Sequence, residues 1–167
     1  MPAPRYLRVL DTLWYYLVLP CTSSDSYSLA KAFYTRCIQA LNAIPEDWRN
    51  YRIVYAMARA LENYAVLGDH HEEPPYYKAE KALLRAIELL ELVREEGQEK
   101  SQWNMRMAYG YQYLYHQEEK AIPYAQRWAE LDPEDENAPA VIRECEEELA
   151  KRSGGELENG AEERAPA

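Results

Sequence analysis

The chain has little glycine, a single phenylalanine, three cysteines and no long uninterrupted apolar segment. These shortages exclude several classes of protein. Six glycines and ten prolines lie mostly between apolar segments of helical periodicity. No alternating run rich in valine, isoleucine or threonine occurs between turn residues, so no strand is predicted. We therefore expect an all-α protein.

The cysteines are too few and too scattered for a cysteine-based site. Cys21, Cys37 and Cys145 are odd in number and show no C-x-x-C spacing. They can neither build a disulfide framework nor form a zinc site with histidines. The number and spacing of the cysteines fit a reducing compartment, and we expect a cytoplasmic protein.

The longest apolar run covers only nine residues, 12–20, which is too short to cross a bilayer. Arg8 and Asp11 precede it, and no small-residue cleavage site follows. We therefore expect no membrane association and no signal peptide.

Positive charge is also in deficit, with 19 basic against 29 acidic residues and a formal net charge of −10. Phosphate backbones and anionic membranes attract basic surfaces, so neither is expected as the main partner. Basic or zwitterionic peptides remain possible. With 47% hydrophobic residues, the chain fits one soluble domain.

Apolar residues recur at helical spacing in seven segments, which end near prolines, glycines or polar loops. The predicted helices are 5–19, 27–42, 46–67, 77–95, 101–115, 118–131 and 138–151. The expected inward faces include Ala30, Phe33, Cys37 and Leu41; Val54, Met57, Ala58 and Leu61; Trp103, Met107, Tyr111 and Leu114; and Val141, Ile142, Cys145 and Leu149. The organisation predicted is a helical domain over 1–152 and a disordered acidic tail over 153–167.

The segment 121–133 carries the most specific motif. Ala121 is followed at +4 by Ala125, at +7 by Trp128 and at +12 by Pro133. Ala79, Leu83 and Ala86 repeat this pattern, with a weaker copy at Cys37, Ala40 and Pro45. Two other segments share a large-small-x-x-large pattern, Met57-Ala58-x-x-Leu61 and Met107-Ala108-x-x-Tyr111.

These motifs resemble the tetratricopeptide repeat family over residues 5–151. The resemblance implies a right-handed α-α superhelix of about three helix pairs followed by a C-terminal capping helix. It further implies a concave groove, lined by the first helix of each pair, that holds a peptide or helix of a partner protein. The resemblance implies no catalysis.

The groove-facing residues would be rich in arginine and tyrosine, which favour recognition. They are Arg52, Tyr55, Arg59, Asn63, Gln102, Arg106, Tyr109 and Tyr113. Alternatively, the arginines pair with neighbours such as Glu62 and the tyrosines cover core edges.

The chain has an unusual ratio of fifteen tyrosines to one phenylalanine. Tyr109, Tyr111, Tyr113 and Tyr115 cannot all lie on one side of a helix, so some must be exposed or meet another surface. Tyrosine also tolerates a half-exposed position. The predicted helix 5–19 is apolar on both sides, which suggests a homodimer contact.

No catalytic or metal site is predicted, and no cofactor. His70, His71, Glu72 and Glu73 are adjacent in a loop and are unsuited to converge on one ion. No nucleophile motif surrounds the serines near residue 24.

The sequence therefore favours a non-catalytic module that binds another protein or peptide. Two alternatives remain. One is an immunity- or antitoxin-type neutraliser, whose negative charge would cover a basic partner. The other is a self-assembling structural protein.

Overall fold

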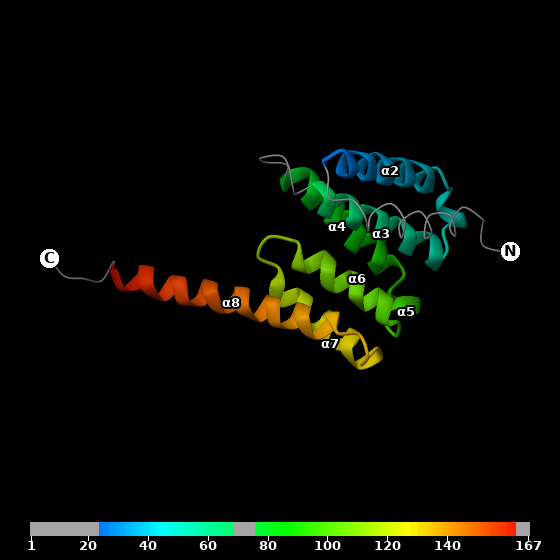
Figure 1. Cartoon of the computed structure of the whole chain (residues 1–167). Coiled ribbons are helices and arrows are strands. Elements are labelled where there is room, and N and C mark those ends of the chain that lie inside the picture. The colour runs from blue at the N-terminus through cyan, green and yellow to red at the C-terminus, as the bar shows by residue number, and fades with distance from the viewer. Residues whose placement is uncertain (1–23, 69–75, 163–167) are drawn as a thin grey trace. The chain divides into compact units, whose positions relative to one another are not determined.

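A computed structural model describes residues 24–68 and 76–162, and these two ranges contain helices and no strand (Figure 1). The expected all-α class is confirmed for them. The helices are α2 (Ser24–Asn42), the 3₁₀ turn η1 (Glu46–Trp48), α3 (Tyr51–Gly68), α4 (Tyr76–Leu92), α5 (Arg94–Gly97), α6 (Ser101–Gln112), α7 (Glu118–Leu131) and α8 (Asn137–Glu162). They form two compact units, divided between Val93 and Arg94.

In the first unit, α3 packs against both α2 and α4. The buried face of α2 carries Ala30, Tyr34, Cys37 and Leu41, which are spaced as one helical stripe. Phe33 was expected in this stripe, but it is only half-buried and Tyr34 is buried instead. The Tyr34 hydroxyl accepts a long hydrogen bond, 3.5 Å, from Asn63 Nδ2 of α3, which offsets the cost of burying it.

In the second unit, α7 packs against both α6 and α8, and α6 also contacts α8. The shared core is built from small residues around one large ring, Trp128. The other buried members are Ala108, Ala121, Ala125, Ala138, Val141 and Cys145. All four alanines are fully buried, so the helix backbones approach closely. Ala108, Ala121 and Ala125 are the small residues of the sequence motifs.

The link between α5 and α6 is fixed by three side chains of these helices. Trp103 is buried, and the guanidinium of Arg94 lies over its ring at 5.5 Å from the centroid. Arg94 Nη2 also donates to the Tyr124 hydroxyl at 3.0 Å. Asn104, exposed by only 2%, donates from Nδ2 to the carbonyls of Gln98 and Lys100 at 2.8 and 2.9 Å. These bonds hold the link that leads into α6, where the Lys100 carbonyl also accepts from the Asn104 backbone N–H at 3.2 Å.

Several helix ends differ from the predictions. The expected helix 46–67 is divided, because the chain turns at Arg49 and Asn50 between η1 and α3. The expected helix 101–115 ends at Gln112, and a turn follows in which His116 has a φ of 58°. The expected helix 77–95 is likewise split into α4 and α5.

The last helix is longer than predicted. We expected it to end near Lys151, before Ser153, Gly154 and Gly155, but α8 continues to Glu162 and its C-terminal part extends beyond α6 and α7 (Figure 1). Ser153 bonds back to the Leu149 carbonyl within the helix at 3.0 Å. Glutamate and leucine farther along favour helix over coil.

Four other residues expected to face inward are only half-buried. They are Leu61, Tyr111, Ile142 and Leu149. The predicted helix 5–19, and with it the proposed homodimer contact, lies outside the described residues.

Candidate partner-binding surface

On α3, the four predicted binding residues form one stripe. Arg52, Tyr55, Arg59 and Asn63 follow the i, i+3, i+7, i+11 spacing, which places them on one side of the helix. The opposite side is buried and carries Ile53, Val54, Met57 and Ala60. Arg52 is exposed and the other three stripe residues are half-buried.

Tyr55 and Asn63 of this stripe contact other residues of the first unit. Tyr55 stacks on Tyr51, with ring centroids 5.9 Å apart, and Asn63 bonds to Tyr34. Glu62, the neighbour proposed to pair with an arginine, is exposed by only 2%. Asn63 therefore also has a structural role, and Arg52 is the stripe residue most accessible to a partner.

On α6, the other four predicted residues form a second stripe. Gln102, Arg106, Tyr109 and Tyr113 lie on the side opposite Trp103, Asn104 and Met107, which are buried. Gln102 is exposed, and Tyr113 is 47% exposed. Tyr109 and Tyr113 stack at 6.0 Å between centroids, so two aromatic faces run along this side of the helix.

Tyr109 joins this stripe to the core. Its ring meets Trp128 edge-on at 5.5 Å. Burial, followed by the nearby Tyr113 and Asp135, raises the pKa of the Tyr109 hydroxyl, and Arg106 partly opposes the shift. The hydroxyl therefore stays protonated at neutral pH and can act as a hydrogen-bond donor.

A pocket of about 310 Å³ opens at the C-terminal end of the α6 stripe, within the second unit. It is lined by Gln112, Tyr113, Glu118, Glu144, Cys145, Glu147 and Glu148. Four of these residues are glutamates. The pocket is therefore strongly acidic and has an aromatic ring at one side.

Its glutamates differ in how their charges are balanced. Glu118 pairs with Arg152, Glu148 pairs with Lys151, and Glu147 lies 3.9 Å from Arg143. Lys151 lowers the pKa of Glu148 through its hydrogen bond. Glu144 accepts a hydrogen bond from the neutral Gln112 Nε2 at 2.8 Å. Among the described residues, Glu144 makes no ion pair.

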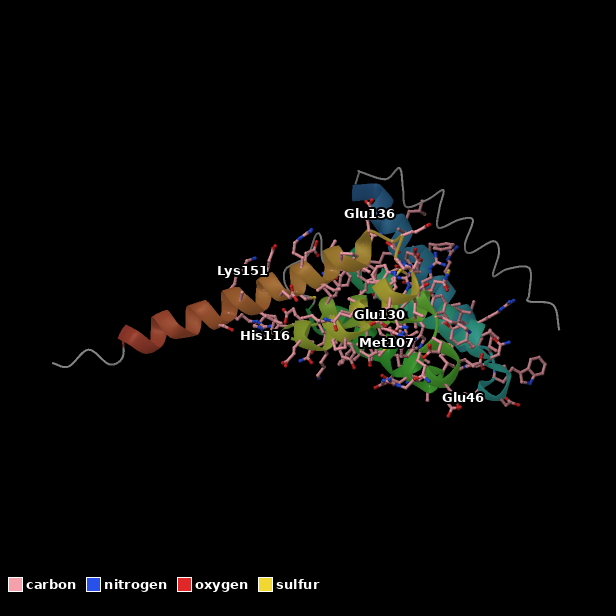
Figure 2. All side chains as sticks on the ribbon, turned by 90° about the horizontal axis from the view of Figure 1, so that it is seen from below. Glu46, Met107, His116, Glu130, Glu136 and Lys151 are labelled. Atoms are coloured by element: carbon pink, nitrogen blue, oxygen red, sulfur yellow. The ribbon has the colours of Figure 1, made fainter. Side chains whose placement is uncertain are left out.

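One wall of this region is held by the turn between α6 and α7. His116 lies beside the middle of α8, near the position from which the Lys151 side chain projects (Figure 2). Arg152 reaches both His116 Nδ1 and Glu118 Oε2. These contacts tie α8 to the start of α7 and keep the pocket walls together.

The sequence predicted Tyr113 as a binding residue but not the other pocket residues. The glutamates of α8 were not among the predicted binding residues. Glu144, Glu147 and Glu148 follow i, i+3, i+4 spacing, so a shared face was visible in the sequence. Nothing in the sequence indicated that Gln112 would meet them.

Over the described part of the chain, no group of three or more histidine, cysteine or acidic residues is placed to hold a metal ion. Within that same part, no helix has the length and apolarity needed to cross a membrane. The loop with His70 and His71 lies outside the described residues.

Comparisons with protein-family models, with curated proteins and with solved structures gave no match to this chain.

Proposed function

We propose that this protein is a non-catalytic module that binds another protein or a peptide through the α3 and α6 stripes. The observation that supports this most is the α6 stripe, where stacked, partly exposed tyrosines lie beside an acidic pocket. Tyrosine is favoured at interfaces because its rigid ring supplies contact area and its hydroxyl a polar bond.

The proposal extends to the arrangement of the helices and to the cellular compartment. We propose that the helix pairs stack as a tetratricopeptide-like superhelix, as the motifs imply. A reducing, cytoplasmic setting fits the free thiols of Cys37 and Cys145, which are both buried.

The test begins with affinity purification from the native organism and mass spectrometry, followed by direct binding measurements on a purified candidate. Arg52→Ala, Gln102→Ala and Tyr113→Ala are the substitutions of choice because these side chains are exposed. Arg59 and Arg106 are half-buried, so replacing them would mix loss of binding with loss of stability.

We expect at least one of these variants to weaken binding by about 1 kcal/mol or more, with an unchanged melting temperature. Arg85→Ala is the matched control for Arg52→Ala, because Arg85 is exposed on α4 and pairs only locally with Glu88. Normal binding by all three stripe variants would exclude the stripes as the interface.

A second candidate is a neutraliser of a basic protein, and the acidic pocket favours it specifically. If the protein is such a neutraliser, reversing the charge of glutamates on α8 should abolish binding, while the stripe variants on α3 should have no effect. Binding by either mechanism should weaken with added salt, so salt dependence alone cannot separate the two.

A further inference from the structure

The outer face of α4 carries two exposed leucines. Ala86 and Leu90 are fully buried on the inner side of this helix, whereas Leu84 is 45% and Leu92 is 74% exposed. Because an α-helix has about 3.6 residues per turn, positions 84, 88 and 92 follow one another along the exposed side. The two leucines therefore lie on one face, about 12 Å apart along the helix axis.

Charged side chains flank these two leucines. Arg85 and Glu88 are exposed, and Arg85 Nη1 donates to Glu88 Oε2 at 2.8 Å. Glu91 is half-buried at one edge of the face. A basic residue thus stands next to Leu84 and an acidic residue next to Leu92. This order makes the face complementary to a second copy of itself that runs in the opposite direction.

Only one alignment of two copies pairs both the leucines and the opposite charges. When two α4 helices lie antiparallel and are centred on Glu88, position 84 meets 92 and position 85 meets 91, so Arg85 lies opposite Glu91. Centring the pair on either leucine instead places Glu88 opposite position 80 or 96, and both are glutamates. A parallel pair would place Arg85 opposite Arg85, and like charges in contact oppose association.

The alignment centred on Glu88 has one unfavourable contact. It brings the two Glu88 side chains together at the two-fold axis. Each of them is bonded to its own Arg85, which reduces their repulsion. The remaining repulsion provides a specific test of the arrangement.

We propose that the outer face of α4 is the contact of an antiparallel homodimer with two-fold symmetry. Leu84 packs on Leu92 of the second copy, once on each side of the axis, and Arg85 lies opposite Glu91. A two-fold contact closes on itself, so it gives a dimer and not a filament. It uses no residue of the α3 and α6 stripes and does not depend on the proposed function.

The dimer should be weak. One helix against one helix buries less surface than a standard interface, so we expect a dissociation constant on the order of 10–100 μM. Sedimentation velocity of the full-length protein, from about 1 to about 500 μM, measures this equilibrium.

Two leucine variants test the alignment. Leu84→Glu and Leu92→Lys should each weaken dimerisation by about tenfold or more, because each places a charge against a leucine. An equal mixture of the two variants should dimerise within about threefold of the unsubstituted protein. In the mixed dimer, the introduced glutamate faces the introduced lysine, and the other contact keeps both of its leucines.

Leu29→Glu is the matched control, because Leu29 is 59% exposed on α2 and lies outside this face. It should change the dissociation constant by less than about twofold. Glu88→Gln should tighten the dimer by about threefold or more, because it removes the like charges at the axis. All four substituted side chains are exposed, and thermal unfolding by circular dichroism verifies that each variant folds.

A protein that stays monomeric up to about 500 μM would overturn the proposal. A dimer weakened by Leu84→Glu but not restored in the mixture would exclude the antiparallel alignment. A dimer insensitive to Leu84→Glu but lost on deletion of 5–19 would place the contact in that predicted helix instead. A monomer in which Leu84→Glu abolishes binding of a validated partner would assign the face to that partner.

The outcome is independent of the test of the stripes. Partner binding measured well below the dissociation constant of the dimer involves the monomer, so Arg85→Ala remains a control for the stripes.

Discussion

At the scale of single residues, Gly97 packs closely against the ring of Trp103. A Cβ atom at Gly97 would lie 2.2 Å from Trp103 Cδ1 and 2.4 Å from Cγ. The indole is buried and held by Arg94, so it has little room to move. Glycine is therefore required here for space, since its φ lies outside the left-handed region.

We predict that Gly97→Ala lowers the free energy of unfolding by about 1–3 kcal/mol because the added methyl overpacks the indole. Urea titration followed by tryptophan fluorescence measures this. Gly154→Ala is the control: no atom lies within 4 Å of its Cβ position, and alanine in a helix should stabilise by about 0.5–1 kcal/mol. Similar effects of the two substitutions would show that Trp103 can move aside.

Cys145 provides a second prediction at this scale. Burial, aided by Glu118, Glu144 and Glu146, raises the pKa of its thiol from about 9 to about 11. The thiolate is the reactive form, so iodoacetamide at pH 8 should modify Cys145 at least about tenfold more slowly in the native protein than in urea. Peptide mass spectrometry measures both rates, and equal rates would contradict the burial.

The same shift predicts a dependence of stability on pH. Because the pKa in the folded protein is above that of the unfolded chain, the contribution of Cys145 is complete below pH 9. It should be lost as pH rises from about 9 to about 11, where only the unfolded chain releases the proton. Cys145→Ala should show a smaller loss of stability over this interval.

At the scale of helices, small residues decide where α6, α7 and α8 meet. Ala108, Ala121 and Ala125 are fully buried, and Trp128 fills the space that they leave. Tyr109 of α6 packs edge-on against Trp128, with ring centroids 5.5 Å apart.

We predict that Ala108→Leu overpacks this contact and costs about 1–3 kcal/mol of stability. Ala150→Leu is the control, because Ala150 is exposed on α8 of the same unit. Thermal unfolding followed by circular dichroism compares the two variants. An unchanged melting temperature for Ala108→Leu would mean that the helices can separate at no cost.

At the scale of the whole molecule, α8 has two parts of different importance. Its first half supplies Ala138, Val141 and Cys145 to the core, and Arg152 binds Glu118 and His116. Beyond it, Ser153 and Gly154 are exposed.

We predict that removing residues 153–167 changes stability by less than about 0.5 kcal/mol, because the glycine, glutamate and proline of this sequence offer no apolar stripe to pack. Removing 137–167 should instead cause aggregation or a far lower melting temperature, since the cluster around Trp128 loses one side. Light scattering and circular dichroism distinguish the two truncations. A destabilised 1–152 protein would show that the end of α8 packs on the rest of the chain.

The sequence by itself determined the helical class, the approximate helices and the small residues at helix contacts. These features depend on local periodicity and on prolines or glycines at helix ends, which act over a few residues. The exact bounds of 118–131, for example, were predicted because its motif is complete. The expected α3 and α6 stripes also follow from spacing alone.

Only the tertiary structure decided which of two adjacent side chains is buried and which polar groups meet. Tyr34 replaces Phe33 in the core because α3 places Asn63 near its hydroxyl. The acidic pocket exists because packing brings Gln112 of α6 to Glu144 of α8, 32 positions apart. This contact depends on the turn at His116 and on how α8 packs against α6 and α7. Neither leaves a periodic signal in the sequence.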